Sequence, residues 1–202
     1  MSVVGIVPAA GAGERLGAEV PKAFAVLGGR PMVEWSLDVL REVCDRVVVA
    51  VPPDRVRAPD FVAGGATRSE SVRNAIAAAP EASVLVVHDA ARPLVTVDLV
   101  RRCVDALEGW DGVVAAVPVT DTVKEVEDGE VIATPDRGRL WAAQTPQVFR
   151  AEPLRRAAGD ATDDASLVEA MGGRVRVVEG LPQNFKVTTP LDVRVAEMLL
   201  AD

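Results

Sequence analysis

The sequence has few of the residues from which metal sites, disulfide frameworks and membrane spans are built. It contains two cysteines, Cys44 and Cys103, which are too few for a zinc site or a disulfide framework, so we expect two reduced thiols. No apolar run is long enough to cross a bilayer, and the N-terminus lacks the basic region and the pattern of a signal peptide. These absences predict a cytoplasmic protein that does not enter a membrane.

Positive charge is also scarce. The formal net charge is −8 and the isoelectric point is about 4.8, which disfavours nonspecific binding to nucleic acid or to an anionic membrane. An anionic substrate must therefore be captured by a local basic pocket. The chain has 202 residues, of which 49% are hydrophobic, and this suits a single domain, residues 1–202, with a full core.

The most informative segment is the loop Pro8–Lys22. It follows an apolar run, Val3–Val7, which we predict to be a buried strand. The small residues at positions 9–13 allow close approach of the backbone to a ligand, and their N–H groups can bind anions. Arg15 and Lys22 add two cations. The loop is therefore predicted to bind a polyphosphate, with a simple surface turn as the alternative.

Two familiar phosphate-binding loops do not match this segment. A P-loop closes with Gly-Lys-Ser/Thr, but Gly17 is followed by Ala18. A dinucleotide-binding fingerprint requires a third glycine where Leu16 stands, and Pro21 interrupts a regular helix. The missing glycine counts against a nicotinamide-dependent oxidoreductase, which is one alternative class of protein.

Strand and helix patterns alternate along the first 118 residues. Strands are expected at 3–7, 46–51, 83–87 and 113–117, and helices at about 31–43, 69–79 and 96–107. Residues 54–61 are expected to be irregular. This order predicts a Rossmann-like three-layer α/β fold with a mostly parallel sheet. Ligands bind beyond the carboxyl ends of such strands, so the Pro8–Lys22 loop and Asp89 should share one site.

The pattern changes after Pro118. Residues 119–133 alternate valine with polar residues around Asp128-Gly129, which predicts a projecting β-hairpin arm at about residues 119–134. A lone hairpin is marginally stable, so it should pack on a second subunit or fold back on its own domain. Beyond it we expect a loop with Trp141 and Thr145-Pro146, helices near 153–158 and 162–171, a strand at 174–178 and a helix at 190–200.

Asp89 stands in the segment H-D-A-A-R-P, directly after a predicted strand. A carboxylate there could hold Mg²⁺ together with substrate phosphates, or it could pair with Arg92 or cap the next turn. His88 is the only histidine, and we interpret it as a structural hydrogen-bonding group rather than a general base. Ser69 and Ser71 are possible caps of the helix that follows two glycines.

Taken together, the motifs resemble those of the 2-C-methyl-D-erythritol 4-phosphate cytidylyltransferase family. They run nearly end to end: the Pro8–Lys22 loop, G-G-x-x-R-x-x-S-V, H-D-A-A-R-P, P-V-T-D-T-V-K, D-R-x-x-L-W-x-x-Q-T-P-Q, T-D-D-A-S and N-F-K-V-T-x-P-x-D. The resemblance implies a nucleotidyltransferase fold and transfer of CMP from CTP to methylerythritol phosphate, with release of pyrophosphate. It also implies Mg²⁺ or another divalent cation, and a homodimer formed through the arm.

The same resemblance assigns roles to individual residues. Arg15 and Lys22 would stabilise the transition state, and Asp89 would hold the metal. The CTP site would comprise Ala9, Ala10, Gly11, Gly65, Ser71, Asp89 and Ala90. Methylerythritol phosphate would be bound by Arg92, Thr122, Arg137, Thr145, Thr162 and Lys186, with Thr122 and Arg137 reaching in from a partner's arm.

Three positions depart from the family pattern. Glu14 weakens the positive field of the loop, Ala66 replaces an acid that could contact the base, and Gln183 stands where some members have an aspartate. The nucleotide half also looks like that of a ribitol 5-phosphate cytidylyltransferase, which is the nearest alternative function. A catalytically inactive binding module is another, although Arg15, Lys22 and Asp89 are all retained.

Overall fold

A seven-stranded sheet forms the centre of the protein in the computed structural model, which describes residues 1–11, 20–157 and 159–201. The strand order is β11-β7-β10-β6-β1-β4-β5. The strands are β1 (Val3–Pro8), β4 (Arg46–Val51), β5 (Phe61–Ala63), β6 (Val84–Val87), β7 (Gly112–Pro118), β10 (Trp141–Arg150) and β11 (Val175–Glu179). Only β10 runs antiparallel to its neighbours, which confirms the predicted mostly parallel sheet.

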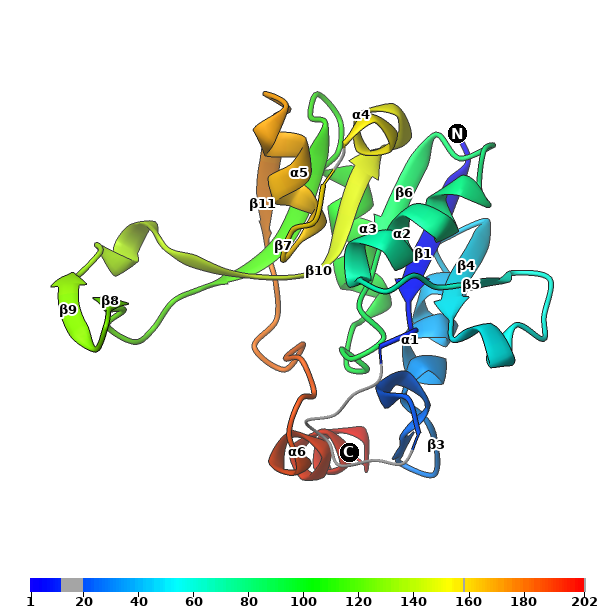
Figure 1. Ribbon diagram of the computed structural model, residues 1–202, viewed down its shortest axis with the longest axis horizontal. Coiled ribbons are helices and arrows are strands. Elements are labelled where there is room, and N and C mark those ends of the chain that lie inside the picture. Colours follow the sequence, from blue (N-terminus) through cyan, green and yellow to red (C-terminus); the bar gives the residue numbers. More distant parts are fainter. Residues whose placement is uncertain (12–19, 158, 202) are drawn as a thin grey trace.

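Helices cover both faces of this sheet and make three layers (Figure 1). They are α1 (Met32–Arg41), α2 (Arg68–Ala77), α3 (Val97–Asp105), α4 (Ala151–Arg156), α5 (Asp164–Ala170) and α6 (Pro190–Ala201). Helices α1 and α3 pack on one face, and α2, α4 and α5 on the other. Helix α6 packs instead beside the small hairpin of β2 (Val26–Leu27) and β3 (Arg30–Pro31). No helix in the described ranges is long and apolar enough to cross a membrane.

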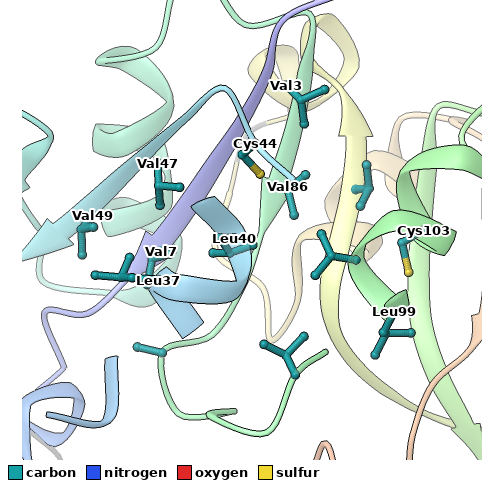
Figure 2. Close-up of a cluster of buried hydrophobic side chains, with 14 of the residues drawn as sticks. Val3, Val7, Leu37, Leu40, Cys44, Val47, Val49, Val86, Leu99 and Cys103 are labelled. Carbon is teal, nitrogen blue, oxygen red and sulfur yellow. The ribbon is translucent and has the colours of Figure 1, made fainter. Parts of the chain in front are cut away.

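Strand periodicity explains the two cores. Successive residues of a strand point to opposite faces, so Val3 and Val7 of β1 join one cluster while Val4 and Ile6 join the other. Figure 2 shows the first cluster, in which Val3, Val7, Val47, Val49 and Val86 meet Leu37, Leu40 and Leu99 of the covering helices. Cys44 and Cys103 lie in this cluster as free, buried thiols, and burial raises the pKa of each to about 12. Both are therefore packing residues.

The structure corrects the sequence analysis at three places. The expected loop with Trp141 and Thr145-Pro146 is strand β10, which lies between β6 and β7. A proline cannot donate to a strand ladder, and the sheet accommodates it where the register shifts between Ala143 and Gln147. The segment expected to be irregular ends in the short edge strand β5. Helix α2 is capped by Thr67 rather than by Ser69 or Ser71.

The predicted arm is confirmed. Strands β8 (Glu125–Glu127) and β9 (Glu130–Ala133) form a separate two-stranded sheet, joined by Asp128 and Gly129 at φ 47° and 86°. Positive φ at both turn residues is the geometry of a type I′ hairpin. Extended chain after β7 and before β10 carries this hairpin far from the body, at the left of Figure 1. The alternative in which the hairpin folds back on its own domain is therefore wrong.

Gly112 of β7 offers a test of how tightly this sheet packs. A Cβ atom at Gly112 would lie 2.7 Å from Cδ1 of Phe149, its cross-strand partner on β10, whose side chain is fully buried. We expect Gly112→Ala to lower the free energy of unfolding by about 1–3 kcal/mol through overpacking. Urea denaturation measures this loss. The loss should shrink in a Phe149→Leu background, and simple additivity of the two substitutions would contradict the proposed contact.

Candidate active site

A cleft of about 620 Å³ lies beyond the carboxyl ends of β1 and β6. It brings together the predicted residues Ala9, Ala10, Gly11, Lys22, Gly65, Ser71, Asp89, Ala90 and Lys186. It is completed by Pro8, Ala23, Ala66, Thr67, Arg68 and Ala91. The position is the one expected for a ligand in a parallel sheet, and small residues form much of the wall.

The glycines at the edge of this cleft are needed for close packing. A Cβ atom at Gly64 would clash with the side chain of Ala10, and one at Gly65 would clash with the side chain of Glu70. The Ser71 hydroxyl accepts a hydrogen bond from the Gly65 N–H (3.0 Å) and donates to the Thr67 carbonyl (3.0 Å). Ser71 therefore fixes the glycine turn, and its contact with a nucleotide base stays a prediction.

Asp89 forms the floor of the cleft and is held by two cations. Its Oδ1 accepts a hydrogen bond from Arg68 Nε at 2.9 Å, and its Oδ2 accepts one from Lys186 Nζ at 2.7 Å. The alternative of an ion pair with Arg92 is wrong: the ion pairs of Asp89 are with Arg68 and Lys186, and the Arg92 backbone N–H donates to the Asp89 carbonyl at 2.9 Å. Burial alone would raise the pKa of Asp89, but Arg68 and Lys186 outweigh it and hold the pKa well below its usual range. Asp89 is therefore an anion at neutral pH.

A second cleft of about 320 Å³ adjoins the first and shares Arg68, Asp89 and Lys186 with it. Its other lining residues are Arg92, Ala143, Gln144, Thr145, Gln147, Thr162 and Asp163. The predicted substrate residues Arg92, Thr145, Thr162 and Lys186 thus meet in one cleft. Arg92 is fixed there by donating Nη1 to the Asn184 carbonyl at 2.8 Å and Nη2 to the Ala143 carbonyl at 3.3 Å.

His88 precedes Asp89, which both clefts share, and its side chain is fully buried. Its Nε2 lies 3.2 Å from the Arg92 carbonyl, which can only accept, so Nε2 carries the proton. Nδ1 then accepts from the Thr145 hydroxyl at 3.0 Å, and that hydroxyl accepts from the Asp89 N–H at 3.0 Å. This geometry agrees with the structural interpretation of His88, because both ring nitrogens are already occupied.

The other predicted residues lie elsewhere. Thr122 and Arg137 are exposed on the arm and line neither cleft, and Arg137 Nη1 donates to the Thr120 carbonyl at 2.6 Å. Arg15 and Glu14 lie outside the described residues. Their roles stay predictions.

Sequence reasoning missed two members of the site. Arg68 lines both clefts, and Asp164 lies behind it, with Arg68 Nη2 at 2.9 Å from Asp164 Oδ2. The arginine of the motif G-G-x-x-R-x-x-S-V was visible in the sequence, but it carried no assigned role. Its partners belong to other elements of the fold, and this pairing leaves no local sequence pattern.

The described side chains suit a metal that arrives with phosphates rather than a preformed metal cage. The described part of the chain has no group of three or more histidine, cysteine, aspartate or glutamate residues that could hold a metal ion. Magnesium in nucleotide sites is commonly bound by one or two carboxylates together with substrate phosphates and water. The ionised carboxylate of Asp89, which lines both clefts, fits that donor set.

The buried histidine predicts a loss of stability in acid. Burial lowers the pKa of His88 to about 4, against an opposing effect of Asp89, whereas an unfolded histidine has a pKa near 6.5. The neutral form is therefore favoured by folding, and the stability that it contributes is complete above pH 6.5 and is lost as the pH falls toward 4. We expect the free energy of unfolding to fall by about 1–2 kcal/mol between pH 7 and pH 5.

Urea denaturation at the two pH values measures this loss. His88 is the only histidine, so His88→Gln should remove that component. An equal fall in wild type and variant would contradict the assignment.

Comparisons with known proteins agree with this architecture along the whole chain. Residues 3–202 match the sequence profile of the family described as 2-C-methyl-D-erythritol 4-phosphate cytidylyltransferase. A protein of that name from Nocardia farcinica is 50% identical over 216 residues, covering 98% of this chain and 94% of the relative. One from Rhodococcus jostii is 47% identical, covering 99% and 96%.

A solved structure shows the same likeness in three dimensions. The crystal structure of 2-C-methyl-D-erythritol 4-phosphate cytidylyltransferase from Thermus thermophilus aligns with a TM-score of 0.87 and 37% identity, covering all of both chains. Together with the full-length sequence match, this shows that the chain belongs to the 2-C-methyl-D-erythritol 4-phosphate cytidylyltransferase family.

Proposed function

We propose that the protein transfers CMP from CTP to 2-C-methyl-D-erythritol 4-phosphate in the two adjoining clefts, releasing pyrophosphate. The observation that carries this assignment is the shared junction of the clefts at Arg68, Asp89 and Lys186. A nucleotide in the larger cleft and an alditol phosphate in the smaller one can bring their phosphates together only there. The family match and the full-length relatives support the same reaction.

The reaction needs no general base. The second pKa of a phosphate monoester is about 6, so the substrate phosphate is largely dianionic at neutral pH and can attack the α-phosphorus of CTP in line. The bond to pyrophosphate breaks as the new phosphorus–oxygen bond forms. This suits a site whose one histidine is buried with both ring nitrogens occupied. The protein must instead position two anions and stabilise their charge.

Cations at the junction meet this requirement. Lys22 lines the nucleotide cleft, and Arg15 belongs to the same loop in sequence. Lys186 lines both clefts, so it can contact the attacking phosphate and the α-phosphate. Preorganised charges of this kind act on the transition state without reorganisation of solvent.

Asp89 would hold Mg²⁺, or another divalent cation, together with the phosphate oxygens of CTP. Such a metal supplies positive charge that offsets the negative charge of the phosphates when it is bound. The contribution of the chain is an ionised carboxylate whose two oxygens are oriented by Arg68 and Lys186.

The second substrate would lie against Arg92, Thr162 and Lys186, with Thr145 shaping the floor. The Thr145 hydroxyl already bonds to His88 and to the Asp89 N–H, so only its remaining lone pair can face a ligand.

Thr122 and Arg137 are exposed and do not line this cleft in their own chain. We propose that they complete the cleft of a second subunit in a cytoplasmic homodimer. The planar guanidinium of Arg137 would bind a phosphate there with two parallel hydrogen bonds.

Product formation tests the proposed function directly. The purified protein is incubated with CTP, Mg²⁺ and methylerythritol phosphate, and the CDP-linked product and pyrophosphate are measured. Ribitol 5-phosphate replaces the methylerythritol phosphate in a parallel reaction. We expect product with the methylerythritol substrate and little with ribitol phosphate, whereas the reverse preference would assign the alternative activity. If neither substrate gave a product, both assignments would be contradicted.

Replacing Lys22 should impair the chemical step. We expect Lys22→Ala to lower kcat by about a hundredfold or more, by analogy with removal of one preorganised charge-stabilising group. The fold should survive, because Lys22 is only partly buried at the rim of the cleft. Steady-state kinetics at saturating substrates, with circular dichroism to verify folding, measure the effect. A folded variant with near-normal kcat would show that Lys22 has no catalytic role.

Mixing two inactive variants tests whether the arm completes a partner's site. Lys22→Ala damages the nucleotide cleft of its own chain, and Arg137→Ala would damage the cleft of the partner. In a mixed dimer one site then carries both lesions and the other carries neither. The two variants are refolded together. If their chains pair at random in a twofold dimer, the mixture should regain up to roughly one quarter of wild-type activity.

The control is each variant refolded alone, which should stay inactive. Proven mixed dimers without recovered activity would place Arg137 in the site of its own chain. A fully active monomer would reject the shared site.

A further inference from the structure

Arg68 occupies a position that helix stability does not explain. It is the first residue of α2, directly after the capping residue Thr67. The N-terminus of a helix carries partial positive charge, so a cation there is electrostatically unfavourable. The side chain is also mostly buried, with 23% of its surface exposed. Burial of a charge is costly unless partners compensate it, so the partners of Arg68 decide its role.

These partners come from two other elements of the fold. Arg68 Nε donates to Asp89 Oδ1 at 2.9 Å, and Nη2 lies 2.9 Å from Oδ2 of Asp164, the first residue of α5. The contact with Asp164 is an ion pair withdrawn from water, because the Asp164 side chain is 2% exposed. One planar guanidinium thus bridges a carboxylate at the junction of the clefts and a carboxylate behind it. A lysine has a single compact charge, so it could not reproduce this fork of coplanar guanidinium N–H groups.

Asp164 is suited to be a fixed anchor. Its side chain is 2% exposed, and it lines neither cleft. The backbone N–H groups of Asp164 and Ala165 both donate to Gln147 Oε1 at 3.0 Å, which ties the start of α5 to strand β10. Asp164 is therefore held away from a ligand in either cleft, and it anchors Arg68 from the protein interior.

We propose that Arg68, anchored by Asp164, is a positioning residue that fixes the carboxylate of Asp89 for the metal-bound nucleotide. The inference rests on the proposed function and adds two residues to it. The two oxygens of Asp89 then have different tasks. Lys186 would leave Oδ2 when it turns to a phosphate of CTP, and Oδ2 would then be available to the metal. Arg68 stays on Oδ1 and keeps the carboxylate in its orientation.

Asp164→Asn is the most selective test, because it removes the anchor without changing the lining of either cleft. The readout is binding of Mn²⁺ in the presence of CTP and without second substrate, measured from the electron paramagnetic resonance signal of free Mn²⁺. We expect binding to weaken by about tenfold, the usual order for a residue that orients a metal ligand. Arg68→Lys, which keeps the charge but loses the fork, should weaken it at least as much.

Arg73→Lys is the matched control. Arg73 lies on the same helix and contacts Gly159 and Asp160, outside the clefts. Its replacement should leave Mn²⁺ binding unchanged.

A double-mutant cycle separates positioning from general stability. If Asp164 acts through Arg68 on Asp89, Asp164→Asn should have no further effect on Mn²⁺ binding in an Asp89→Asn background. Additive effects, or unchanged Mn²⁺ affinity in folded Asp164→Asn and Arg68→Lys, would overturn the inference. The proposed function is judged separately by formation of the CDP-linked product in wild type. If wild type forms that product while the inference fails, the proposed function stands, so the two failures are distinguishable.

Discussion

The ion pairs around Asp89 are the interaction on which the site depends. Two acidic residues, Asp89 and Asp164, and two cations, Arg68 and Lys186, form a cluster of ion pairs where the two clefts meet. Each ion is partly or fully withdrawn from water, and only the pairing makes that withdrawal tolerable. The cluster therefore concentrates anionic and cationic groups at one point of an acidic protein, the point at which we propose that the substrate phosphates meet.

Strand β10 makes this arrangement possible. Within the described seven-stranded sheet it alone runs antiparallel to its neighbours, and it is inserted between β6 and β7, so its residues near Thr145 lie beside the carboxyl end of β6. From this position the Thr145 side chain hydrogen-bonds to His88 and to the Asp89 N–H, and the Gln147 side chain hydrogen-bonds to the start of α5. The register shift before Gln147 lets a proline enter the strand without a break in the sheet. The second cleft is a consequence of this inserted strand.

The arm has a different physical basis. Its strands bury no core of their own, and Val126, Val131 and Ile132 are about half exposed. A two-stranded ribbon of this kind has little stability by itself, so its extended position depends on the strands that lead into it from the sheet. Arg137, which follows the hairpin in sequence, lines neither cleft of its own chain. The shape of the monomer thus leaves the second cleft without a residue that the family resemblance assigns to it.

Local patterns determined most of the fold. Buried β-branched runs predicted β1, β4, β6 and β7, and Asp128-Gly129 predicted the hairpin turn, because these signals depend on near neighbours in sequence. The sequence likewise predicted that Ala9, Ala10, Gly11 and Lys22 share one site, and these four residues line the larger cleft.

Strand β10 escaped prediction because Thr145-Pro146 reads locally as a break, and only the sheet on both sides stabilises a strand there. Asp89 was recognised from its position after a strand. Its true partners, Arg68 and Lys186, were decided by the tertiary structure, since an ion pair between distant segments depends on how α2 and the chain before α6 pack against β6. The sequence shows which residues are charged, but which charged residues form ion pairs is decided only when folding withdraws them from water.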